Sequence, residues 1–504
     1  MTGDPSESES IREFAARALA AWSPVVVSNR APYEAGPRNT MRKGAGGLVT
    51  ALLTVADATG ADWVCCARNE AERKRGENGR PVEVPGRLEP LRIHYAVPDP
   101  DAYHGYYSVI SNPLLWFLQH YLWNLPYEPL ITEQTWEAWR DGYRKVNRLM
   151  ADRVIRVAGE LDRPPLVLTQ DYQLYLAPRH IREALPEATL QQFIHIPWPT
   201  PNYWKVIPRE MRHAILDGLL ANDVIGFQTS VDARNFLGSC DELLGLRVDY
   251  RDRVVLHDGR AVWVRHYPIS VDLPGLAQQA AESDVERELE ELRRERPPLR
   301  IARVDRTDPS KNIVRGFLAY ERLLRAHPEW LEQVQFHAFL QPSRQDITAY
   351  RDYLDQIERT ADRINRSFGT PSWQPVRLEL EENFPRALAI YRDFDVLLVN
   401  PIYDGMNLVA KEGMVINERA GALVLSENAG AFEELGEFAF RVNPFDVDAT
   451  AEALQAALTA PAAEREERRQ SIGRVIATHD IGRWLVDQVE DVRDLAPRAG
   501  TEIV

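Results

Sequence analysis

Cysteine is scarce in this sequence, and no apolar run is long enough to cross a bilayer. The chain has 504 residues but only 3 cysteines. Two of them, Cys65 and Cys66, are adjacent and cannot bridge to each other without strain, so no disulfide framework is expected. A membrane-spanning helix needs about 20 apolar residues, and the N-terminus lacks a charged segment followed by an apolar one. We therefore expect a cytoplasmic protein.

An excess of positive charge is also missing. The chain carries 60 basic and 75 acidic residues, which give a formal net charge of −15. A generally acidic surface argues against nucleic acid or an anionic membrane as the main partner. An anionic substrate would therefore have to be held by a local basic pocket.

Two series of short apolar runs predict two doubly wound α/β domains. A chain of this length is too long for one compact core, and a helical appendage is expected in addition. Apolar residues recurring from Trp136 to Val154 predict a long amphipathic core helix. The predicted domains are residues 1–267 and 268–480, with a final helix at 481–504 that crosses back to the first domain. The predicted strands are 24–30, 63–66, 166–169, 190–196, 223–228, two short ones near 254 and 263, and then 300–304, 334–339, 376–380, 396–399, 422–426 and 438–442.

The stretch DVLLVNPIYDGMNLVAKEG, residues 395–413, has the composition of a ligand-binding turn. The apolar run 396–399 is typical of a parallel strand that is covered on both faces. Helical spacing from Met406 to Glu418 would leave the first N–H groups of that helix free, which suits an anion. Asp404 and Glu412 could accept hydrogen bonds from sugar hydroxyls. The alternative is a helix cap on an ordinary α/β crossover, and this stretch alone does not decide between the two.

Other candidate groups stand at the ends of predicted strands. Arg306 and Lys311 lie five residues apart across a strand-to-helix turn, so they could converge on one diphosphate. Asp171 and His195 follow two strands of the first series, where open parallel sheets bind their ligands. Surface cations on loops and a buried histidine with a backbone partner are the alternative interpretations. A glycine-rich turn at 43–49 fits neither the Walker pattern nor a strict GxGxxG pattern.

Ten motifs occur in the same order over nearly the whole chain as in a known enzyme family. They are SNR, GAGGLV, SNPLLW, QDYQL, FIHIPWPTP, DVIGFQT, DRTDPSKN, PSR, DGMNLVAKE and LSENAGA. In this the sequence resembles the trehalose-6-phosphate synthase family. These are retaining glycosyltransferases of the GT-B fold, in which two Rossmann-like domains face a central cleft. The resemblance implies transfer of glucose from UDP- or GDP-glucose to glucose 6-phosphate, which yields α,α-trehalose 6-phosphate and a nucleoside diphosphate, with no metal and no cofactor.

The resemblance also implies a role for each matching residue. Arg306 and Lys311 match the pair that neutralises the leaving diphosphate, and His195 matches a histidine on the donor sugar. Asp171 matches the carboxylate on the acceptor side, so a front-face substitution is expected instead of a double displacement through a carboxylate nucleophile. The matching acceptor-phosphate residues are Arg30, Tyr107, Trp116 and Arg344. The matching donor-binding residues are Gly47, Asp404, Gly405, Met406, Asn407, Leu408, Val409 and Glu412.

Some features of the sequence leave alternatives open. Gln170 and Gln173 stand where the family typically has the histidines of HDYH. Cys66 stands where the family usually has a second tryptophan after the strand at Trp63. These departures bear on the identity of the acceptor. The RTDPSKN and HIPWP segments also resemble the pseudo-glycosyltransferase of the validamycin pathway, which couples cyclitols, but the complete DGMNLVAKE motif favours a sugar transferase. A non-catalytic sugar-nucleotide sensor is the other alternative. The sequence does not decide the nucleobase, and it leaves homo-oligomerisation open.

Overall fold

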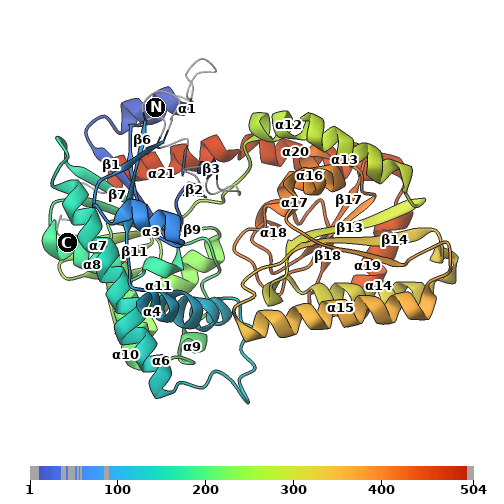
Figure 1. Cartoon of the computed structure of the whole chain (residues 1–504), viewed down its shortest axis with the longest axis horizontal. Helices are drawn as coiled ribbons and strands as arrows, with labels where there is room; N and C mark the ends of the chain where they lie inside the picture. Colours follow the sequence, from blue (N-terminus) through green and yellow to red (C-terminus); the bar gives the residue numbers. More distant parts are fainter. Residues whose placement is uncertain are drawn as a thin grey trace. The chain divides into compact units, whose positions relative to one another are not determined.

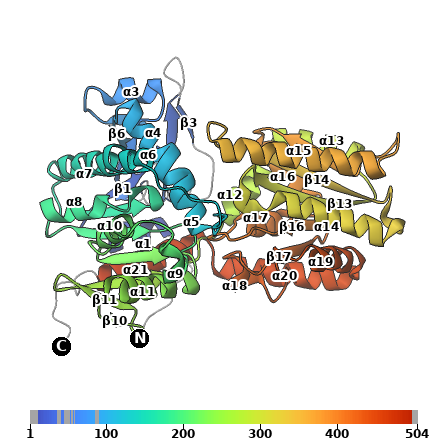
Figure 2. The same ribbon diagram turned by 90° about the horizontal axis from the view of Figure 1, so that it is seen from below.

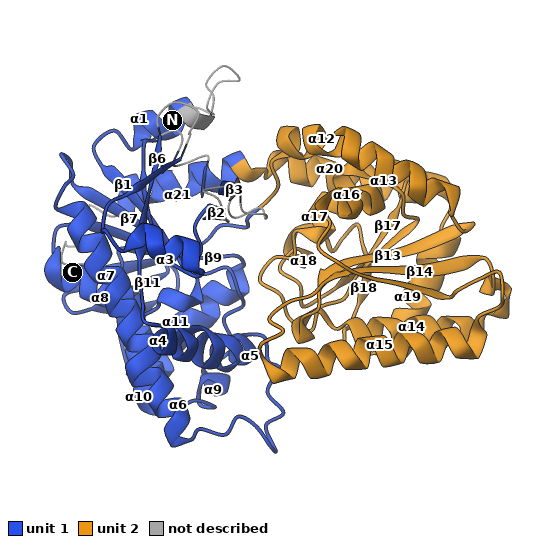
Figure 3. Ribbon diagram, in the orientation of Figure 1, with its two compact units in different colours: residues 1–269, 482–504 blue, residues 270–481 orange. Residues whose placement is uncertain are grey.

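The chain divides into two compact α/β units. The computed structural model describes residues 11–35, 41–43, 52–53, 56, 59–84 and 90–495. Unit 1 comprises residues 1–269 and 482–504, and unit 2 comprises residues 270–481 (Figure 3). Within the described residues, none of the helices is long and apolar enough to span a membrane. Gly47 and the rest of the predicted glycine-rich turn from residue 44 onward lie outside the described residues.

Unit 1 is built on a ten-stranded sheet with the order β10-β11-β12-β9-β8-β7-β1-β4-β6-β5. The strands from β12 to β6 in this order pair in parallel, and the outer strands are antiparallel to their neighbours. The side chains of Val25, Val26 and Val27 are completely buried, as expected for a parallel strand between two helical layers. The strands of unit 1 are β1 (Ser23–Ser28), β2 (Tyr33–Ala35), β3 (Met41–Lys43), β4 (Asp62–Cys66), β5 (Val82–Val84), β6 (Leu91–Ala96), β7 (Pro165–Gln170), β8 (Thr189–Phe193), β9 (Val224–Phe227), β10 (Val248–Asp249), β11 (Val254–His257) and β12 (Arg260–His266).

The helices of unit 1 bury the predicted apolar faces against this sheet. The helical stretch that contains Trp139, Tyr143 and Met150 packs through them into the core, because these side chains recur at helical spacing. Part of that stretch, Ala138–Arg144, is π-helical, as is Gly105–Leu115. The α-helices are α1 (Ile11–Ala18), α3 (Glu70–Gly76), α4 (Pro100–His104), α5 (Trp116–Gln119), α6 (Glu133–Glu137), α7 (Lys145–Ala158), α8 (Ala177–Ala184), α9 (Pro201–Trp204), α10 (Arg209–Leu219), α11 (Ser230–Leu244) and α21 (Ile481–Leu495).

The last helix, α21, packs on the sheet of unit 1. The Trp484 ring meets the edge of Phe193 on β8, with the ring centroids 5.4 Å apart. Gln191, two residues earlier and therefore on the same face of β8, donates from Nε2 to Gln488 Oε1 at 3.0 Å. Tyr267 completes this contact by donating from its hydroxyl to Asp491 Oδ2 at 2.7 Å.

Unit 2 is a six-stranded parallel sheet with the order β15-β14-β13-β16-β17-β18. Figure 2 shows β14, β13, β16 and β17 following one another across the sheet. In Figure 1, α14, α15 and α19 lie along one face of this sheet, and α12, α13, α16 and α20 lie along the other. Its strands are β13 (Leu299–Arg306), β14 (Val334–Gln341), β15 (Val376–Leu380), β16 (Val396–Val399), β17 (Ala422–Ser426) and β18 (Phe440–Val442). Its helices are α12 (Leu273–Ala280), α13 (Ser283–Arg294), α14 (Ile313–Ala326), α15 (Thr348–Phe368), α16 (Phe384–Arg392), α17 (Val409–Ile416), α18 (Phe432–Leu435), α19 (Val447–Thr459) and α20 (Ala462–Thr478).

The predicted fold class, α/β with two doubly wound domains, is confirmed by these two sheets. In each sheet the strand order reverses once between neighbouring parallel strands, between β1 and β7 in unit 1 and between β13 and β16 in unit 2. Ligands of open α/β sheets bind at the carboxyl ends of the strands at such a reversal. The search for functional groups therefore begins at these two places.

Candidate active site

The reversal in unit 2 brings the two predicted halves of a phosphate site together. The turn after β13 carries Lys311, and the loop after β16 carries Asp404. Lys311 Nζ forms an ion pair with Asp404 Oδ2, and both side chains are mostly buried, with 12% and 14% exposed. A second donor, Asn407 Nδ2, reaches the same carboxylate oxygen at 2.9 Å. A cation and a carboxylate 93 residues apart in the sequence thus face each other at the end of the sheet.

Four consecutive backbone N–H groups, those of residues 406–409 at the start of α17, have no acceptor among the described residues. The prediction that the helix starts at Met406 is wrong, because α17 begins at Val409 and ends at Ile416. Asn407 has φ +75°, a left-handed conformation that cannot continue into a right-handed helix. In the described part of the chain, the N–H groups of Met406, Asn407, Leu408 and Val409 donate to no backbone or side-chain acceptor. Consecutive unpaired N–H groups form a binding place for an anion.

The loop of residues 404–408 is held in shape by a neighbouring turn after β17. Gly430 N donates to the carbonyl of Asp404 at 3.0 Å, and Ala431 N donates to that of Met406 at 2.8 Å. A Cβ on Gly430 would lie 1.8 Å from the Gly405 carbonyl oxygen, so only glycine allows the two backbones to come this close. The LSENAGA motif therefore holds the 404–408 loop in place through backbone hydrogen bonds.

Glu412 is a half-buried carboxylate that has no hydrogen-bond donor among the described residues. It lies on α17, and its carboxylate accepts no hydrogen bond from any residue described in the structure. Burial raises its pKa from 4.5 to about 7. Burial also raises the pKa of Asp305, at the end of β13, to about 6, although Arg303 and Lys311 act in the opposite direction. A carboxylate in this state is stabilised by hydroxyl groups that donate to it, as a ribose would do.

Arg344 lies in unit 2 beside the turn that carries Lys311. Its Nη1 donates to Asp308 Oδ2 at 3.0 Å, and its guanidinium lies 5.3 Å from the centre of the Tyr350 ring. The other oxygen of Asp308 accepts from both the N–H and the hydroxyl of Ser310, at 3.0 and 2.8 Å. One completely buried carboxylate thus orients both Arg344 and the turn before Lys311. Arg306 is the last residue of β13 and lies opposite Gln341 in the sheet.

The parallel pairing of β7 and β8, beside the reversal in unit 1, brings Asp171 and His195 together. Asp171 follows β7 with φ +69°, which is unusual for a residue other than glycine and is often found at functional sites. Its Oδ1 accepts the backbone N–H of His195 at 3.1 Å. The His195 ring is bonded to two glutamines, through Nε2 to Gln170 Oε1 at 3.0 Å and through Nδ1 to Gln228 Nε2 at 3.1 Å. Burial lowers the pKa of His195 to about 3, so the ring is neutral at ordinary pH.

The predicted acceptor-phosphate residues of unit 1 lie after β1 and in the helical stretch from 105 to 119. Arg30 follows β1 and is exposed. The Tyr107 ring is stacked on Tyr103, with the centroids 5.7 Å apart. Trp116 lies 5.6 Å from the ring of Tyr172, the residue after Asp171. The contact with Tyr172 places the Trp116 ring close to Asp171, where an aromatic face suits the binding of a sugar.

Cys66, one of the departures from the family pattern, belongs to the core. Its thiol is completely buried and lies 3.4 Å from Met150 Sδ. It is bonded to none of the predicted site residues. The Gln173 carbonyl accepts from Asn147 Nδ2 at 3.0 Å and so helps to fix the QDYQ segment on α7.

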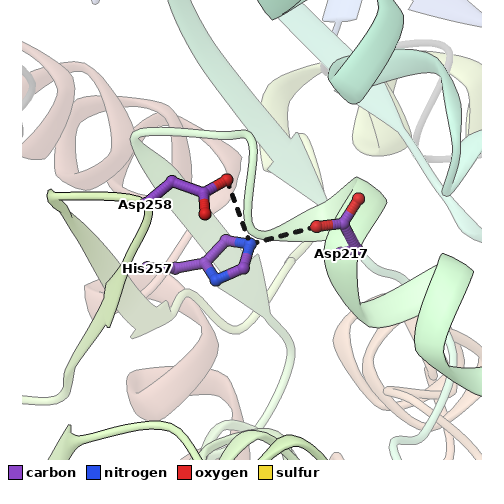
Figure 4. Close-up of side chains that lie close together, drawn as sticks. All are labelled: Asp217, His257 and Asp258. Atoms are coloured by element: carbon purple, nitrogen blue, oxygen red, sulfur yellow. Dashed lines mark hydrogen bonds and ion pairs between the residues drawn. The ribbon is translucent and has the colours of Figure 1, made fainter.

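Three potential metal ligands gather elsewhere in unit 1, but a guanidinium already lies among them. His257 Nε2 lies 3.0 Å from Asp217 Oδ1 and 3.5 Å from Asp258 Oδ2 (Figure 4). Arg179 donates to both carboxylates, at 2.5 Å to Asp217 and 3.1 Å to Asp258. The arginine supplies the positive charge that a metal ion would supply, and the group contains none of the predicted site residues.

Comparison with known proteins identifies the family of this chain. A family model described as glycosyltransferase family 20 matches residues 22–494. The chain belongs to this family. The trehalose-6-phosphate synthase of Salmonella choleraesuis is similar to this chain, with 35% identity over 484 residues, covering 94% of this chain and 96% of the relative. The bifunctional trehalose-6-phosphate synthase/phosphatase of Thermoproteus tenax is 35% identical over 477 residues, and the chain spans 62% of that relative's length.

Solved structures of similar proteins share the fold. A trehalose-6-phosphate synthase structure from Escherichia coli with bound UDP-2-fluoro glucose matches with a TM-score of 0.81 and 31% identity, covering 94% of this chain and 99% of the other. The UDP-forming trehalose-phosphate synthase of Burkholderia xenovorans in complex with glucose 6-phosphate matches with a TM-score of 0.78 and 28% identity, covering 93% and 100%. These matches confirm the predicted GT-B-like fold.

The sequence interpretation missed three groups that shape the site. Gln228 ends a predicted strand and could have been found by the same rule that indicated Asp171 and His195. Asp308 stands within the DRTDPSKN motif, where an aspartate before proline signals a cap or turn. Asp305 gave no sequence signal, because a carboxylate at the end of a buried strand is also common in ordinary loops.

Proposed function

We propose that this chain is a retaining glycosyltransferase that moves glucose from a nucleoside diphosphate glucose to glucose 6-phosphate and so forms α,α-trehalose 6-phosphate. The cluster at the strand reversal of unit 2 is the observation that carries the proposal. There Lys311 and the unpaired N–H groups of residues 406–409 suit a diphosphate, while Asp404 and Glu412 suit hydroxyl groups. A nucleotide sugar presents these two kinds of group in one molecule.

The names of the relatives support this choice of substrates. The relatives named above are trehalose-6-phosphate synthases, and two of their structures contain a UDP-glucose analogue or glucose 6-phosphate. Unit 2 would bind the donor. Asp171 and the residues Arg30, Tyr107 and Trp116 of unit 1 would bind the acceptor, and the family resemblance assigns Arg344 to the acceptor phosphate. UDP-glucose is the first donor to test, and GDP-glucose is the second.

Donor binding in this proposal exchanges the partners of one ion pair. Without ligand, Asp404 balances the charge of Lys311. A bound diphosphate would take over Lys311, and the sugar hydroxyls would donate to the released Asp404 carboxylate. The exchange makes Lys311 available only when a ligand supplies both a phosphate and a hydroxyl, so it favours the complete nucleotide sugar over free phosphate.

The proposed chemistry is a front-face substitution. The bond between C1 of glucose and the diphosphate breaks with its electron pair on the phosphate oxygen, and the acceptor hydroxyl oxygen bonds to C1 from the same face. The hydroxyl proton passes to the departing phosphate oxygen. Lys311, Arg306 and the N–H groups at 406–409 stabilise the charge that builds there without reorganising. Double displacement would need a carboxylate nucleophile, whereas Asp171 Oδ1 is held by the His195 N–H.

The assay for this proposal measures nucleotide release from UDP-, GDP- and ADP-glucose with glucose 6-phosphate, with glucose, and with no acceptor. We expect release to depend on glucose 6-phosphate. Tight nucleotide binding in a parallel calorimetric titration, without release under any condition, would instead support a sugar-nucleotide sensor. Release that is equally fast without acceptor would contradict a transferase.

Arg344 and Arg30 are expected to control the acceptor. Replacing either residue with alanine removes a charge-assisted contact to the acceptor phosphate, so the KM for glucose 6-phosphate should rise about tenfold or more. The KM for the nucleotide sugar should change less than about twofold. Steady-state kinetics with each substrate varied in turn measures the difference.

An exposed arginine provides the control for this prediction. Arg359 lies on α15, and its Nε donates to the Asp355 carbonyl of the same helix at 3.1 Å. Arg359→Ala should change neither KM. Equal increases of both KM values in Arg344→Ala would show that this arginine does not belong to the acceptor subsite.

A further inference from the structure

The imidazole of His195 is one link in a chain of hydrogen bonds that ends in the backbone at both sides. Gln228 Oε1 accepts from the N–H of Ile269 at 2.9 Å, and Gln228 Nε2 faces His195 Nδ1 at 3.1 Å. On the other side, His195 Nε2 faces Gln170 Oε1 at 3.0 Å, and Gln170 Nε2 points to the carbonyl of Leu168 at 3.4 Å. All five residues belong to unit 1.

The backbone groups at the two ends set the direction of every bond in this chain. A backbone N–H can only donate, so the Gln228 group that faces Ile269 must be the oxygen. Its NH₂ group then faces Nδ1, which must be the unprotonated nitrogen of the ring. The proton consequently lies on Nε2 and points to the oxygen of Gln170. In the opposite tautomer, the Nδ1–H group and the NH₂ group of Gln228 would face each other as two donors. Neither would have an acceptor there, which costs the desolvation energy of an unpaired buried group.

We propose that Gln228 and Gln170 are positioning residues that hold His195 as the neutral Nε2–H tautomer, so that the ring neither gains nor loses a proton during the reaction. The tautomer itself follows from the contacts, whereas the role in the reaction rests on the proposed function. The amide of Gln170 offers an acceptor that keeps the same protonation state over the whole physiological pH range.

The surroundings of His195 agree with a ring that does not titrate. The Phe193 ring lies 4.4 Å from it, centroid to centroid. Asp171, the carboxylate in contact with this residue, accepts the backbone N–H and not a ring nitrogen. Among the described residues, no charged side chain bonds to either ring nitrogen. The low pKa of His195 has the same cause, since burial without a counter-charge disfavours the imidazolium.

The direct test is long-range proton–nitrogen NMR on the full chain with histidine labelled with nitrogen-15. The His195 signals are assigned by their loss in His195→Asn. We expect a protonated Nε2 and an unprotonated Nδ1, with no change from about pH 5 to 8, where ordinary histidines titrate. An Nδ1–H pattern, or titration within this range, would overturn the inference.

A charge substitution tests the role of Gln228. In Gln228→Glu, a carboxylate would face Nδ1 and accept a hydrogen bond from it once this nitrogen is protonated. The carboxylate would thus favour the imidazolium, so His195 should titrate in the measured range. The matched control is Gln191→Glu, because Gln191 is also a buried glutamine of this sheet but bonds to Gln488. His195 should keep its wild-type signals in that control. If Gln228→Glu fails to fold, Gln228→Met serves instead, and both tautomers should then appear; unchanged His195 signals in a folded Gln228 variant would contradict the proposal.

Turnover provides a second readout. In the wild type, kcat should show no contribution from His195, and any change near pH 6 to 7 belongs to Asp305 or Glu412. In Gln228→Glu it should fall about tenfold for each pH unit below the new pKa, because an imidazolium opposes the positive charge that develops on the donor sugar. A chain that has the expected tautomer but transfers no glucose would contradict the proposed function alone. Transfer with the wrong tautomer, or the same pH profile in both proteins, would contradict this inference alone.

Discussion

Replacing Lys311 with alanine is expected to lower kcat by about 10²- to 10³-fold, which corresponds to the loss of one charge-assisted contact to a developing anion. The ion pair with Asp404 shows that Lys311 Nζ already lies at the strand reversal and beside the unpaired N–H groups of the 404–408 loop. Arg306→Ala should lower kcat to a similar extent. Steady-state kinetics at saturating substrates measures the effect.

A second substitution separates chemistry from stability in this experiment. Lys311→Ala leaves Asp404 without its cation, and the Asn407 side chain remains as a donor, so a modest loss of thermal stability is expected. Adding Asp404→Asn removes the uncompensated charge and should recover that stability without recovering kcat. Arg322→Ala, which changes an exposed arginine paired with Asp448 on the surface, should leave both quantities unchanged. Near-wild-type turnover in Lys311→Ala, or its recovery in the double variant, would rule out the assignment.

Replacing Glu412 with glutamine is expected to weaken nucleotide binding by about 10- to 100-fold, as the loss of hydrogen bonds to a charged group typically does. The same substitution should stabilise the ligand-free protein at high pH. The pKa of Glu412 is raised from 4.5 to about 7 in the folded state, so the folded protein holds this proton more tightly than the unfolded chain does. Stability is therefore lost as the pH rises from about 4.5 to 7, by on the order of 3 kcal/mol.

Two measurements check the sign of this effect. Thermal unfolding should give equal stabilities for Glu412→Gln and the wild type at about pH 4, and a more stable variant above about pH 7. Ribose hydroxyls would lower the pKa of Glu412, so nucleotide binding near pH 6.5 should release protons. Calorimetry in buffers of different ionisation enthalpy detects this release, and it should vanish in Glu412→Gln. Unchanged release would assign it to another group, for example Asp305, and would remove Glu412 from the ribose subsite.

The sequence predicted the sheets well wherever the strands are apolar throughout. The run Val396–Val399 matches β16 because a strand covered on both faces needs an unbroken apolar sequence. β6 was not among the predicted strands, since Arg92 and His94 interrupt its apolar pattern. Both side chains bond to Asp62 on the neighbouring strand β4. These polar residues interrupt the apolar pattern by which a strand is recognised in the sequence.

The site residues could be proposed from motifs, but their arrangement could not. No spacing rule relates Lys311 to Asp404, because they become neighbours only through the order of β13 and β16 in the sheet. The late start of α17 depends on the left-handed conformation of Asn407, which helical spacing does not reveal. The hydrogen bonds around His195 likewise depend on side-chain conformations of Gln170 and Gln228, which come from three-dimensional packing.

The most direct test of the proposed reaction follows one labelled carbon. UDP-glucose carrying carbon-13 at C1 is incubated with glucose 6-phosphate and the purified chain, and the product is examined by NMR. We predict one labelled product, in which C1 is bonded through oxygen to C1 of glucose 6-phosphate with the α configuration retained, and one molecule of nucleoside diphosphate for each molecule of product. If UDP-glucose is not used, GDP-glucose is tested in the same way. Free labelled glucose, inverted configuration, or no labelled product with either donor would contradict the proposal.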